Sequence, residues 1–403
     1  MRLLFLTPYL PSPPRSGGAA RMHGLISTLA RRHEVAILAY ARPGEDLEEA
    51  RAATGAYAVE IVTVENPHFG VSPLRRRAGQ LISLLSRHSY ERRSYYHPEL
   101  QRALDRLAAS WQPDAIVVEF AQMGYFRFPA GIPVILDAHN VEFDLQLRMS
   151  GGGSLLRRTY ASRNAAKLRR DEAALLRRVA AAASTSMRDR ELLLGLAPGA
   201  RIEVIPNGVA TAEFRPQEKP EQGPATVLFF GALDYYPNVD AVLRFRRAIW
   251  ARLRARWPEL RFVVVGREPP RAVRALDGHA GVEVTGQVDD LRPWLAAASV
   301  VVVPLRFGGG TRLKVLEALA MARPVVSTSV GVEGLDVEHG RHLLIAEDRA
   351  EFGSAVELLL SEPELAARLG AAGRRLVEQR YDWGPISERL EGLIAEVVAA
   401  RHG

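Results

Sequence analysis

The 403-residue chain contains no cysteine, few aromatic residues and no long apolar run. Without cysteine it forms no disulfide, no thiolate metal site and no cysteine nucleophile. No stretch reaches the roughly 18 uninterrupted apolar residues that a membrane-spanning helix needs. The Walker spacing and the Gly-x-Gly-x-x-Gly fingerprint are also missing, so any phosphate site must be built in another way.

The remaining composition is that of an ordinary globular protein, with 47% hydrophobic and 25% charged residues. The length exceeds one typical core, so we expect two domains. A formal net charge of +7 favours anionic partners such as phosphates, lipid headgroups or nucleic acid. Aromatic–basic repeats, zinc ligands and nucleic-acid-binding signatures are absent, so we expect no nucleic-acid partner.

The chain begins with MRLLFLTPYL, in which one cation precedes a short apolar run that proline breaks. The run is too short for a signal peptide, and no small-residue cleavage site follows it. We interpret it as a first core strand. We expect a cytoplasmic protein, either soluble or attached peripherally to the inner face of a membrane.

Apolar strand patterns alternate with helical patterns along the whole chain. The strands expected in the first half cover 2–7, 34–39, 59–64, 115–119 and 134–137. Those expected in the second half cover 227–230, 261–265, 282–285, 300–304 and 324–327. Continuous apolar strands that alternate with helices indicate parallel sheets covered on both faces. With the polar, proline-rich segment Phe214–Pro224 between the halves, the sequence predicts an α/β protein with two doubly wound, Rossmann-like domains.

Two arginine-rich segments depart from this alternation. Pro73–Tyr96 places five aliphatic side chains among six arginines, and Leu155–Val179 is a long helical pattern with arginines throughout. Such segments could lie on an anionic membrane surface. Alternatively, each packs its apolar stripe on the protein core and exposes its arginines. The sequence leaves both interpretations open.

The run Arg306–Pro324, RFGGGTRLKVLEALAMARP, follows the apolar stretch Ser299–Leu305. Three glycines let the backbone approach an anion, which the free amides of the following helix can bind. Arg312 and Lys314 stand in the first turn of that helix, where the dipole disfavours cations unless an anion lies among them. Glu317, one turn further on, is placed to accept hydrogen bonds from a ribose diol. The run predicts a nucleoside diphosphate site; an ordinary turn with surface charges is the alternative.

This run and several other motifs resemble the retaining glycosyltransferases of family 4, which have the GT-B fold. In the second half, the resemblance rests on GGGTRLKVLEALAMARPVVST, on IPNGV at 205–209, on Gly231 after its strand and on Val264-Val265-Gly266. In the first half, it rests on SGGAAR at 16–21 and LDAHN at 136–140. The motifs lie in the expected order over nearly the whole chain.

The resemblance implies a GT-B architecture, in which two Rossmann-like domains face each other across a cleft. It implies an acceptor-binding domain at 1–208 and a donor-binding domain at 209–384, with a C-terminal helix at 385–403 that packs back on the first domain. The implied partners are a nucleotide-sugar donor and a glycan or lipid-linked acceptor. The basic charge adds contact with an anionic membrane to these expectations.

The same resemblance implies a role for individual residues. Glu317 would hold the ribose, and Arg312 and Lys314 would contact the diphosphate. Gly18 would offer a backbone amide to the phosphate, and His139 would contact the transferred sugar. The expected catalytic residues are thus His139, Arg312 and Lys314. The expected donor-binding residues are Gly17, Gly18, Gly231, Arg267, Gly309, Gly310, Thr311 and Glu317.

Two positions depart from the family's pattern. The first of its two motif glutamates is replaced by Gly309, so the usual contact to the sugar hydroxyls must come from elsewhere. A basic pair that commonly follows the first C-terminal strand is replaced by GALDYYPN, and Arg267, or Arg312 with Lys314, would supply that charge. The departures leave the base and the sugar of the donor open.

Arg21, Glu119 and Glu333 are further candidates. Arg21 follows Gly17–Gly18 by one turn and would help to bind an anion, although the glycines could simply permit a turn. Glu119 ends a strand, where capping or packing would explain it equally well. Glu333 follows the strand at 324–327 and would line the donor pocket.

We expect no metal and no other cofactor. Asp289–Asp290 precede a helical pattern and most simply cap it. The chain contains no Asp-x-Asp triplet, the metal motif of the other major glycosyltransferase fold.

The implied reaction is sugar transfer to an acceptor hydroxyl with retention at the anomeric carbon, by a hexosyltransferase. A nucleotide-sugar epimerase on the same fold and a non-catalytic sugar-nucleotide-binding module are the alternatives. Arginine-rich segments suit a membrane-proximal acceptor, which favours the synthesis of a cell-surface polysaccharide or glycolipid.

Overall fold

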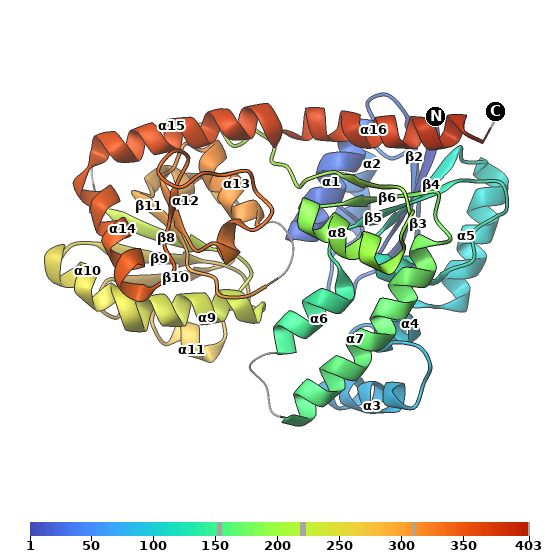
Figure 1. Ribbon diagram of the computed structural model, residues 1–403, viewed down its shortest axis with the longest axis horizontal. Coiled ribbons are helices and arrows are strands. Elements are labelled where there is room, and N and C mark those ends of the chain that lie inside the picture. The colour runs from blue at the N-terminus through green and yellow to red at the C-terminus, as the bar shows by residue number, and fades with distance from the viewer. Residues whose placement is uncertain (151–154, 218–222, 309–311, 402–403) are drawn as a thin grey trace. The chain divides into compact units, whose positions relative to one another are not determined.

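The computed structural model describes residues 1–150, 155–217, 223–308 and 312–401, and it divides the chain into two compact units (Figure 1). Unit 1 comprises Met1–Asn207 and Trp383–Gly403, and unit 2 comprises Gly208–Asp382. The sequence-based division falls after residues 208 and 384. Within unit 2, Val209 pairs with Asp382, so the chain enters and leaves this unit through neighbouring segments.

Unit 1 is built on a seven-stranded parallel sheet with the order β3-β2-β1-β4-β5-β6-β7. Its strands are β1 (Arg2–Thr7), β2 (Glu34–Ala41), β3 (Glu60–Glu65), β4 (Ala115–Glu119), β5 (Val134–Ala138), β6 (Ala181–Ser184) and β7 (Ile202–Val204). Consecutive residues of β1 and β4 are buried. Because successive side chains of a strand point to opposite faces, both faces of the sheet are covered there.

The helices of unit 1 connect these strands. They are α1 (Gly17–Leu29), α2 (Leu47–Gly55), α3 (Pro73–Leu84), α4 (Tyr90–Tyr95), α5 (Pro98–Trp111), the 3-10 turn η1 (Ala121–Tyr125), α6 (Glu142–Ser150), α7 (Leu155–Leu176), α8 (Met187–Leu196) and the C-terminal α16 (Trp383–Ala399). Several begin at a serine or aspartate cap, as α1 does at Ser16, whose hydroxyl accepts a hydrogen bond from the Ala19 amide.

Unit 2 repeats this architecture with a six-stranded parallel sheet in the order β10-β9-β8-β11-β12-β13. Its strands are β8 (Thr226–Phe230), β9 (Arg261–Val265), β10 (Val282–Gly286), β11 (Val300–Val303), β12 (Val325–Ser327) and β13 (Leu344–Ile345). Its helices are α9 (Tyr236–Phe245), the π-helical turn η2 (Arg246–Trp250), α10 (Ala251–Arg256), α11 (Arg271–Arg274), α12 (Arg292–Ala297), α13 (Leu313–Ala320), the 3-10 turn η3 (Val330–Val332), α14 (Arg349–Ser361) and α15 (Pro363–Arg380).

The prediction of two doubly wound, Rossmann-like α/β domains is confirmed by these sheets. The expected strands are all present, but the sequence did not predict β6, β7 or β13. One helix start also differs, because α13 begins at Leu313 and Arg312 is its N-terminal cap. The segment Pro73–Tyr96 forms two helices, α3 and α4, and each begins at a serine cap.

The C-terminal helix α16 lies along α1 within unit 1 (Figure 1). Its first residue, Trp383, packs directly over Gly24 of α1. A Cβ atom at Gly24 would come within 2.2 Å of the indole ring. Glycine is therefore needed here for close approach of the ring to the helix.

Gly24→Ala should lower the free energy of unfolding by about 1–3 kcal/mol, because the indole must shift to admit the methyl group. Gly392→Ala in α16 is the matched control, since open space surrounds its Cβ position. That change should be neutral or raise stability by up to about 1 kcal/mol through helix propensity. Urea denaturation of both variants checks this, and equal effects would contradict the packing described.

Candidate active site

The strand order of each unit indicates where a ligand can bind. The order reverses between β1 and β4 in unit 1, and between β8 and β11 in unit 2. In doubly wound sheets, ligands bind in the crevice outside the carboxyl ends of the strands at this reversal. Each unit carries a cluster of the predicted residues at this point.

In unit 2 the cluster is centred on Lys314, the second residue of α13. Its Nζ donates a hydrogen bond to Asn238 Oδ1 at 2.8 Å. It also lies 4.4 Å from the centroid of the Phe229 ring, a cation–π contact. Asn238 is fixed in turn, because its Nδ2 donates to Ala232 O at 2.8 Å. Groups from β8 and α9 thus hold the ammonium in one place.

Gly231 follows β8 directly below this ammonium. Its φ of 143° lies in the region that favours glycine, and a Cβ atom would come within 2.7 Å of Lys314 Nζ. Any side chain at this position would displace the lysine or strain the backbone. The structure therefore brings the predicted residues Gly231 and Lys314 together.

Burial shifts the pKa values of both titratable side chains in this cluster, Lys314 and Glu317. Burial and, to a smaller extent, the neighbouring Arg312 lower the pKa of Lys314 to about 7, against the opposing effect of Glu317. Burial raises the pKa of Glu317 to about 7, against the effect of Lys314. The two side chains are three residues apart on α13 and share a face of the helix. Among the described residues, the Glu317 carboxyl has no hydrogen-bond partner.

Arg312 is buried beside the same cluster. A Cβ atom at Gly308 would come within 2.7 Å of Arg312 Nη2, so the guanidinium packs against the glycine backbone. The predicted donor-binding residues Gly309, Gly310 and Thr311 lie outside the residues that the structure describes.

Arg267 and Glu333 lie at the same edge of the sheet. Arg267 follows β9, the neighbour of β8, and its Nη2 donates to Asp234 Oδ2 at 3.1 Å. The departure GALDYYPN thus supplies an acid that pairs with Arg267. Glu333 follows η3 after β12 and is partly exposed.

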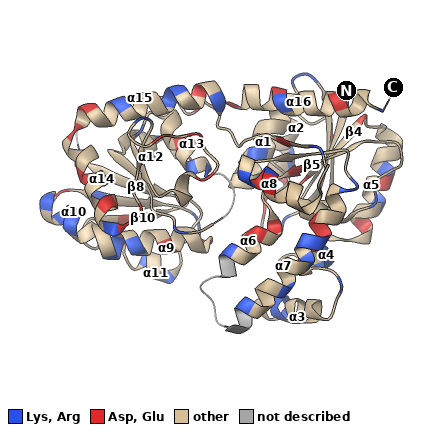
Figure 2. Ribbon diagram, in the orientation of Figure 1, with Lys and Arg blue, Asp and Glu red and all other residues tan. Residues whose placement is uncertain are grey.

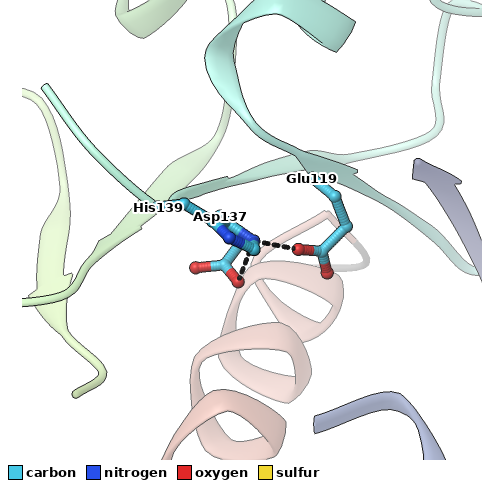
Figure 3. A group of neighbouring side chains, drawn as sticks. All are labelled: Glu119, Asp137 and His139. Carbon is cyan, nitrogen blue, oxygen red and sulfur yellow. Dashed lines mark hydrogen bonds and ion pairs between the residues drawn. The ribbon is translucent and has the colours of Figure 1, made fainter. Parts of the chain in front are cut away.

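In unit 1 the cluster comprises Glu119, Asp137 and His139 (Figure 3). Glu119 and Asp137 are register partners at the ends of β4 and β5, and all three side chains are buried. His139 Nε2 lies 2.7 Å from Glu119 Oε2 and 3.5 Å from Asp137 Oδ2. The structure therefore brings two predicted site residues, Glu119 and His139, into direct contact.

Arg21 joins this cluster from α1. Its Nε and Nη2 donate to the two oxygens of Asp137 at 2.8 and 2.6 Å. Its Nη1 donates to Pro206 O at 2.9 Å and to Asn207 Oδ1 at 3.0 Å. Arg21, predicted as an anion ligand, thus makes four hydrogen bonds inside unit 1 and positions Asp137 and the chain after β7. Asn207, from the IPNGV motif, is one of its partners.

Burial also sets the protonation of the cluster. It raises the pKa of Glu119 well above its ordinary value, an effect that the Asp137 charge reinforces. Burial would raise the pKa of Asp137 too, but the Arg21 guanidinium overrides it and lowers that pKa. Burial lowers the pKa of His139 to about 3. At neutral pH the cluster therefore contains the Arg21–Asp137 ion pair and a neutral His139, beside a Glu119 carboxyl whose raised pKa favours protonation.

Among the described residues, these three side chains form the group whose donor atoms come close enough for a metal, within 4.8 Å of one another. Both Asp137 oxygens already accept hydrogen bonds from Arg21. A metal would have to displace the guanidinium or bind beside its charge. The donor set therefore does not fit a resident metal ion.

Two aromatic rings, which the sequence analysis missed, shape this cluster. Phe120 has a φ of 67° and stacks on the His139 ring with centroids 3.6 Å apart. Positive φ is costly for a bulky residue, and its presence next to a buried histidine is typical of functional sites. A Cβ atom at Gly18 would come within 2.6 Å of Tyr9 Oη and 2.7 Å of Phe120. The backbone of Gly18 thus lies against both rings, and neighbouring Gly17 begins α1.

A separate pocket of about 660 Å³ lies in unit 1, after β2 and β3. Its lining combines apolar surface with polar side chains and includes Arg42, Glu45, Glu65, Asn66, Phe69 and His97. Glu45 Oε2 and His97 Nδ1 are buried and have no hydrogen-bond partner among the described residues. Sequence reasoning missed this pocket, although the neighbouring strand ends at Ala41 and Glu65 were a usable signal.

Comparison with known families agrees with the fold. Two doubly wound, Rossmann-like units of this kind form the GT-B fold. Residues 15–213 match the family described as Glycosyltransferase Family 4, and residues 224–362 match Glycosyl transferases group 1. The chain belongs to the family 4 glycosyltransferases, as its motifs predicted.

Individual proteins of known function or structure share less than a third of their residues with this chain. Glycogen synthase of Mycobacterium tuberculosis is 28% identical over 303 residues, which cover 69% of this chain and 67% of the relative. Sucrose-phosphate synthase of Thermosynechococcus elongatus has a similar structure, with a TM-score of 0.71 at 18% identity over 99% of this chain and 100% of the other. HepE of Anabaena, solved with UDP and glucose, has a TM-score of 0.67 at 14% identity over 98% of this chain and 99% of the other.

Arg21→Met should lower the free energy of unfolding by about 3–5 kcal/mol, because it leaves the Asp137 carboxylate buried without its partner. Arg15→Ala is the control: its ion pair with Glu49, at 2.7 Å, is exposed and should contribute about 1 kcal/mol or less. Chemical denaturation of both variants measures the difference. A small effect of Arg21→Met would contradict its structural role.

Proposed function

We propose that this protein transfers a sugar from a nucleoside diphosphate sugar to an acceptor hydroxyl, with retention of the anomeric configuration. The Lys314 ammonium carries this proposal, because it is fixed at the carboxyl edge of unit 2, beside a glycine backbone and a carboxyl group. The presence of UDP and glucose in HepE, which shares this fold, supports a nucleotide sugar as the donor.

In this proposal, unit 2 binds the nucleotide. Lys314 and Arg312 contact the diphosphate, and Glu317 accepts hydrogen bonds from the ribose hydroxyls. Asn238 acts as a positioning residue, because its Oδ1 accepts a hydrogen bond from Lys314 Nζ and so holds the ammonium in place. Arg267 also lies at this edge, but its ion pair with Asp234 offsets its charge, so it adds little to the positive potential there.

During transfer, the bond between the anomeric carbon and the diphosphate oxygen breaks, and its electron pair leaves with the diphosphate. The acceptor oxygen bonds to the same carbon on the same face, and its proton passes to the leaving phosphate. Lys314 and Arg312 stabilise the negative charge that develops on the leaving group. Because two cations already meet this charge, we propose that turnover needs no added divalent metal or other cofactor.

We assign to unit 1 the contacts to the transferred sugar and the acceptor. His139 is held through Nε2, which leaves Nδ1 for a sugar hydroxyl, and the Gly18 amide is available to the donor phosphate. The pocket after β2 and β3 is the candidate site for a glycan or lipid-linked acceptor, since carboxyl, imidazole and aromatic groups together suit sugar recognition. This chemistry fits the synthesis of a cell-surface polysaccharide or glycolipid.

The direct test supplies UDP-, GDP- and ADP-linked sugars with glycan and lipid-linked acceptors, in the presence of EDTA. We expect acceptor-dependent release of one nucleoside diphosphate and a product whose anomeric configuration, read by NMR, matches the donor. An inverted product would reject retention. Turnover that requires added metal would reject the role given to the two cations.

Glu317→Ala should weaken nucleoside diphosphate binding about tenfold or more, because it removes hydrogen bonds between a charged group and the ribose. The fold should be unaffected, as the Glu317 carboxyl accepts no hydrogen bond from the described residues. Glu338→Ala, at an exposed position of the same unit, is the control. Calorimetric titration measures both, and unchanged affinity in Glu317→Ala would reject the ribose contact.

Nucleoside diphosphate binding should weaken as the pH rises from about 6 to 8.5. The pKa of Lys314 is about 7 in the free protein, so the ammonium that the diphosphate needs is progressively lost above that value. Bound diphosphate raises this pKa again, and binding is therefore accompanied by proton uptake.

The Lys314→Gln variant should show a flatter pH dependence than the natural chain, whereas Glu317→Gln should keep the part that Lys314 causes. Comparison of the slopes removes the titration of the nucleotide itself. Equal slopes in the natural chain and in Lys314→Gln would show that Lys314 does not contact the diphosphate.

A further inference from the structure

Helix α3 exposes the side of itself that its sequence would normally bury. Leu74, Leu81 and Leu85 are 78%, 64% and 93% exposed, and Ile82 is 52% exposed. The three leucines are seven and four residues apart, so they share one face of the helix. They form, with Ile82, an outward apolar stripe.

The opposite face of α3 packs on the body of unit 1, against α4 and α7. Ser83 is buried, and Lys167 of α7 donates hydrogen bonds to the carbonyls of Ser83 and Leu84 at 2.5 and 3.3 Å. Gly79 approaches Tyr90, whose ring would lie 3.3 Å from an added Cβ. Ser83 lies about half a turn around the helix from Leu81, since each residue advances by ~100°. The outward direction of the stripe is therefore fixed by packing.

The surroundings of the stripe are positively charged. Arg75, Arg76 and Arg77 are exposed on α3, and Arg87 follows it. Residues 66–90 contain no aspartate or glutamate. Figure 2 shows Lys and Arg positions around α3 and the adjoining α7. By contrast, α7 itself buries its apolar residues, among them Ala165, Leu168 and Leu175, so the other arginine-rich segment packs on the core.

We propose that α3 docks this protein on an anionic lipid bilayer, with the apolar stripe inserted among the acyl chains and the arginines at the headgroups. An interfacial helix has this distribution of leucine and arginine. The arginines flanking the stripe can extend their charges to the lipid phosphates while the leucines insert. None of the helices in the described part of the chain is long and apolar enough to cross a bilayer, so attachment of these residues is by surface contact.

The positive charge around the stripe favours an anionic bilayer over a second copy of the chain as the surface that covers it. A symmetric dimer through α3 would bring Arg75–Arg77 of both copies into one interface, where residues 66–90 offer no aspartate or glutamate to pair with them. Like charges face to face disfavour such a contact. Anionic headgroups instead complement the arginines and leave the stripe free to insert.

Sedimentation with vesicles tests the proposal. One set of vesicles contains phosphatidylcholine alone, and the other contains phosphatidylcholine with about 30% of the anionic lipid phosphatidylglycerol. The full chain should bind the anionic vesicles and bind the neutral ones weakly. Leu74→Ser/Leu81→Ser/Leu85→Ser should reduce the partition coefficient by about tenfold or more, because three inserted side chains are lost. Thermal unfolding should be unchanged, since these side chains are exposed.

Matched variants control for the number of changes. Val59→Ser/Met187→Ser/Leu358→Ser replaces three other exposed apolar residues and should bind the anionic vesicles as the natural chain does. Arg75→Glu/Arg77→Glu should lose binding, whereas Arg368→Glu/Arg375→Glu on α15, with the same change in net charge, should keep most of it.

Equal vesicle binding by the stripe variant and its control would overturn the proposal. So would a dimer or a complex with another protein that the stripe variant abolishes while vesicles remain unbound. Loss of binding in both the stripe and arginine variants, with both controls intact, is the result that the proposal predicts.

Discussion

The candidate donor site depends on a lysine that is held at a sheet edge where its charge is not fully neutralised. Among the described residues, an amide oxygen, an aromatic face and a nearby carboxyl stabilise the Lys314 ammonium, and burial lowers its pKa to about 7. Holding a cation in this state costs stability that a bound anion would restore. The missing side chain of Gly231 leaves room for the Lys314 ammonium, and the hydrogen bond from Asn238 to Ala232 orients the amide oxygen toward it.

In unit 1, by contrast, the buried arginine is paired directly with a buried carboxylate. Arg21 and Asp137 form a bidentate pair, and Pro206 and Asn207 accept the remaining hydrogen bonds. This pair leaves no net charge beside His139, which burial keeps neutral. A neutral imidazole stacked on Phe120 can contact a sugar without attracting the phosphate. The two clusters therefore differ in charge: the one in unit 2 contains the basic side chains of Lys314 and Arg312, whereas the buried arginine of unit 1 is paired with Asp137.

Most strands of the two sheets could be predicted from the sequence, because buried parallel strands appear as continuous apolar runs. Strand β6 escaped prediction since its sequence, AAAS, has low strand propensity and is buried only by tertiary context. Asn238 and Arg21 could not be assigned their roles, because their partners are 76 and 116 residues away in the chain. The apolar stripe of α3 has the same periodicity whether it packs inward or faces out, so only the position of Ser83 and Lys167 decides its direction.

The most direct test of the account is a thermal-shift screen of the protein against UDP, GDP, ADP, CMP and dTDP, with and without magnesium. The account predicts that at least one nucleoside diphosphate raises the melting temperature without metal, and that CMP has the smallest effect because it lacks the second phosphate. That result would also name the base of the donor. A protein that responds to none of these nucleotides would contradict the claim that Lys314 and Glu317 form a nucleotide-binding site.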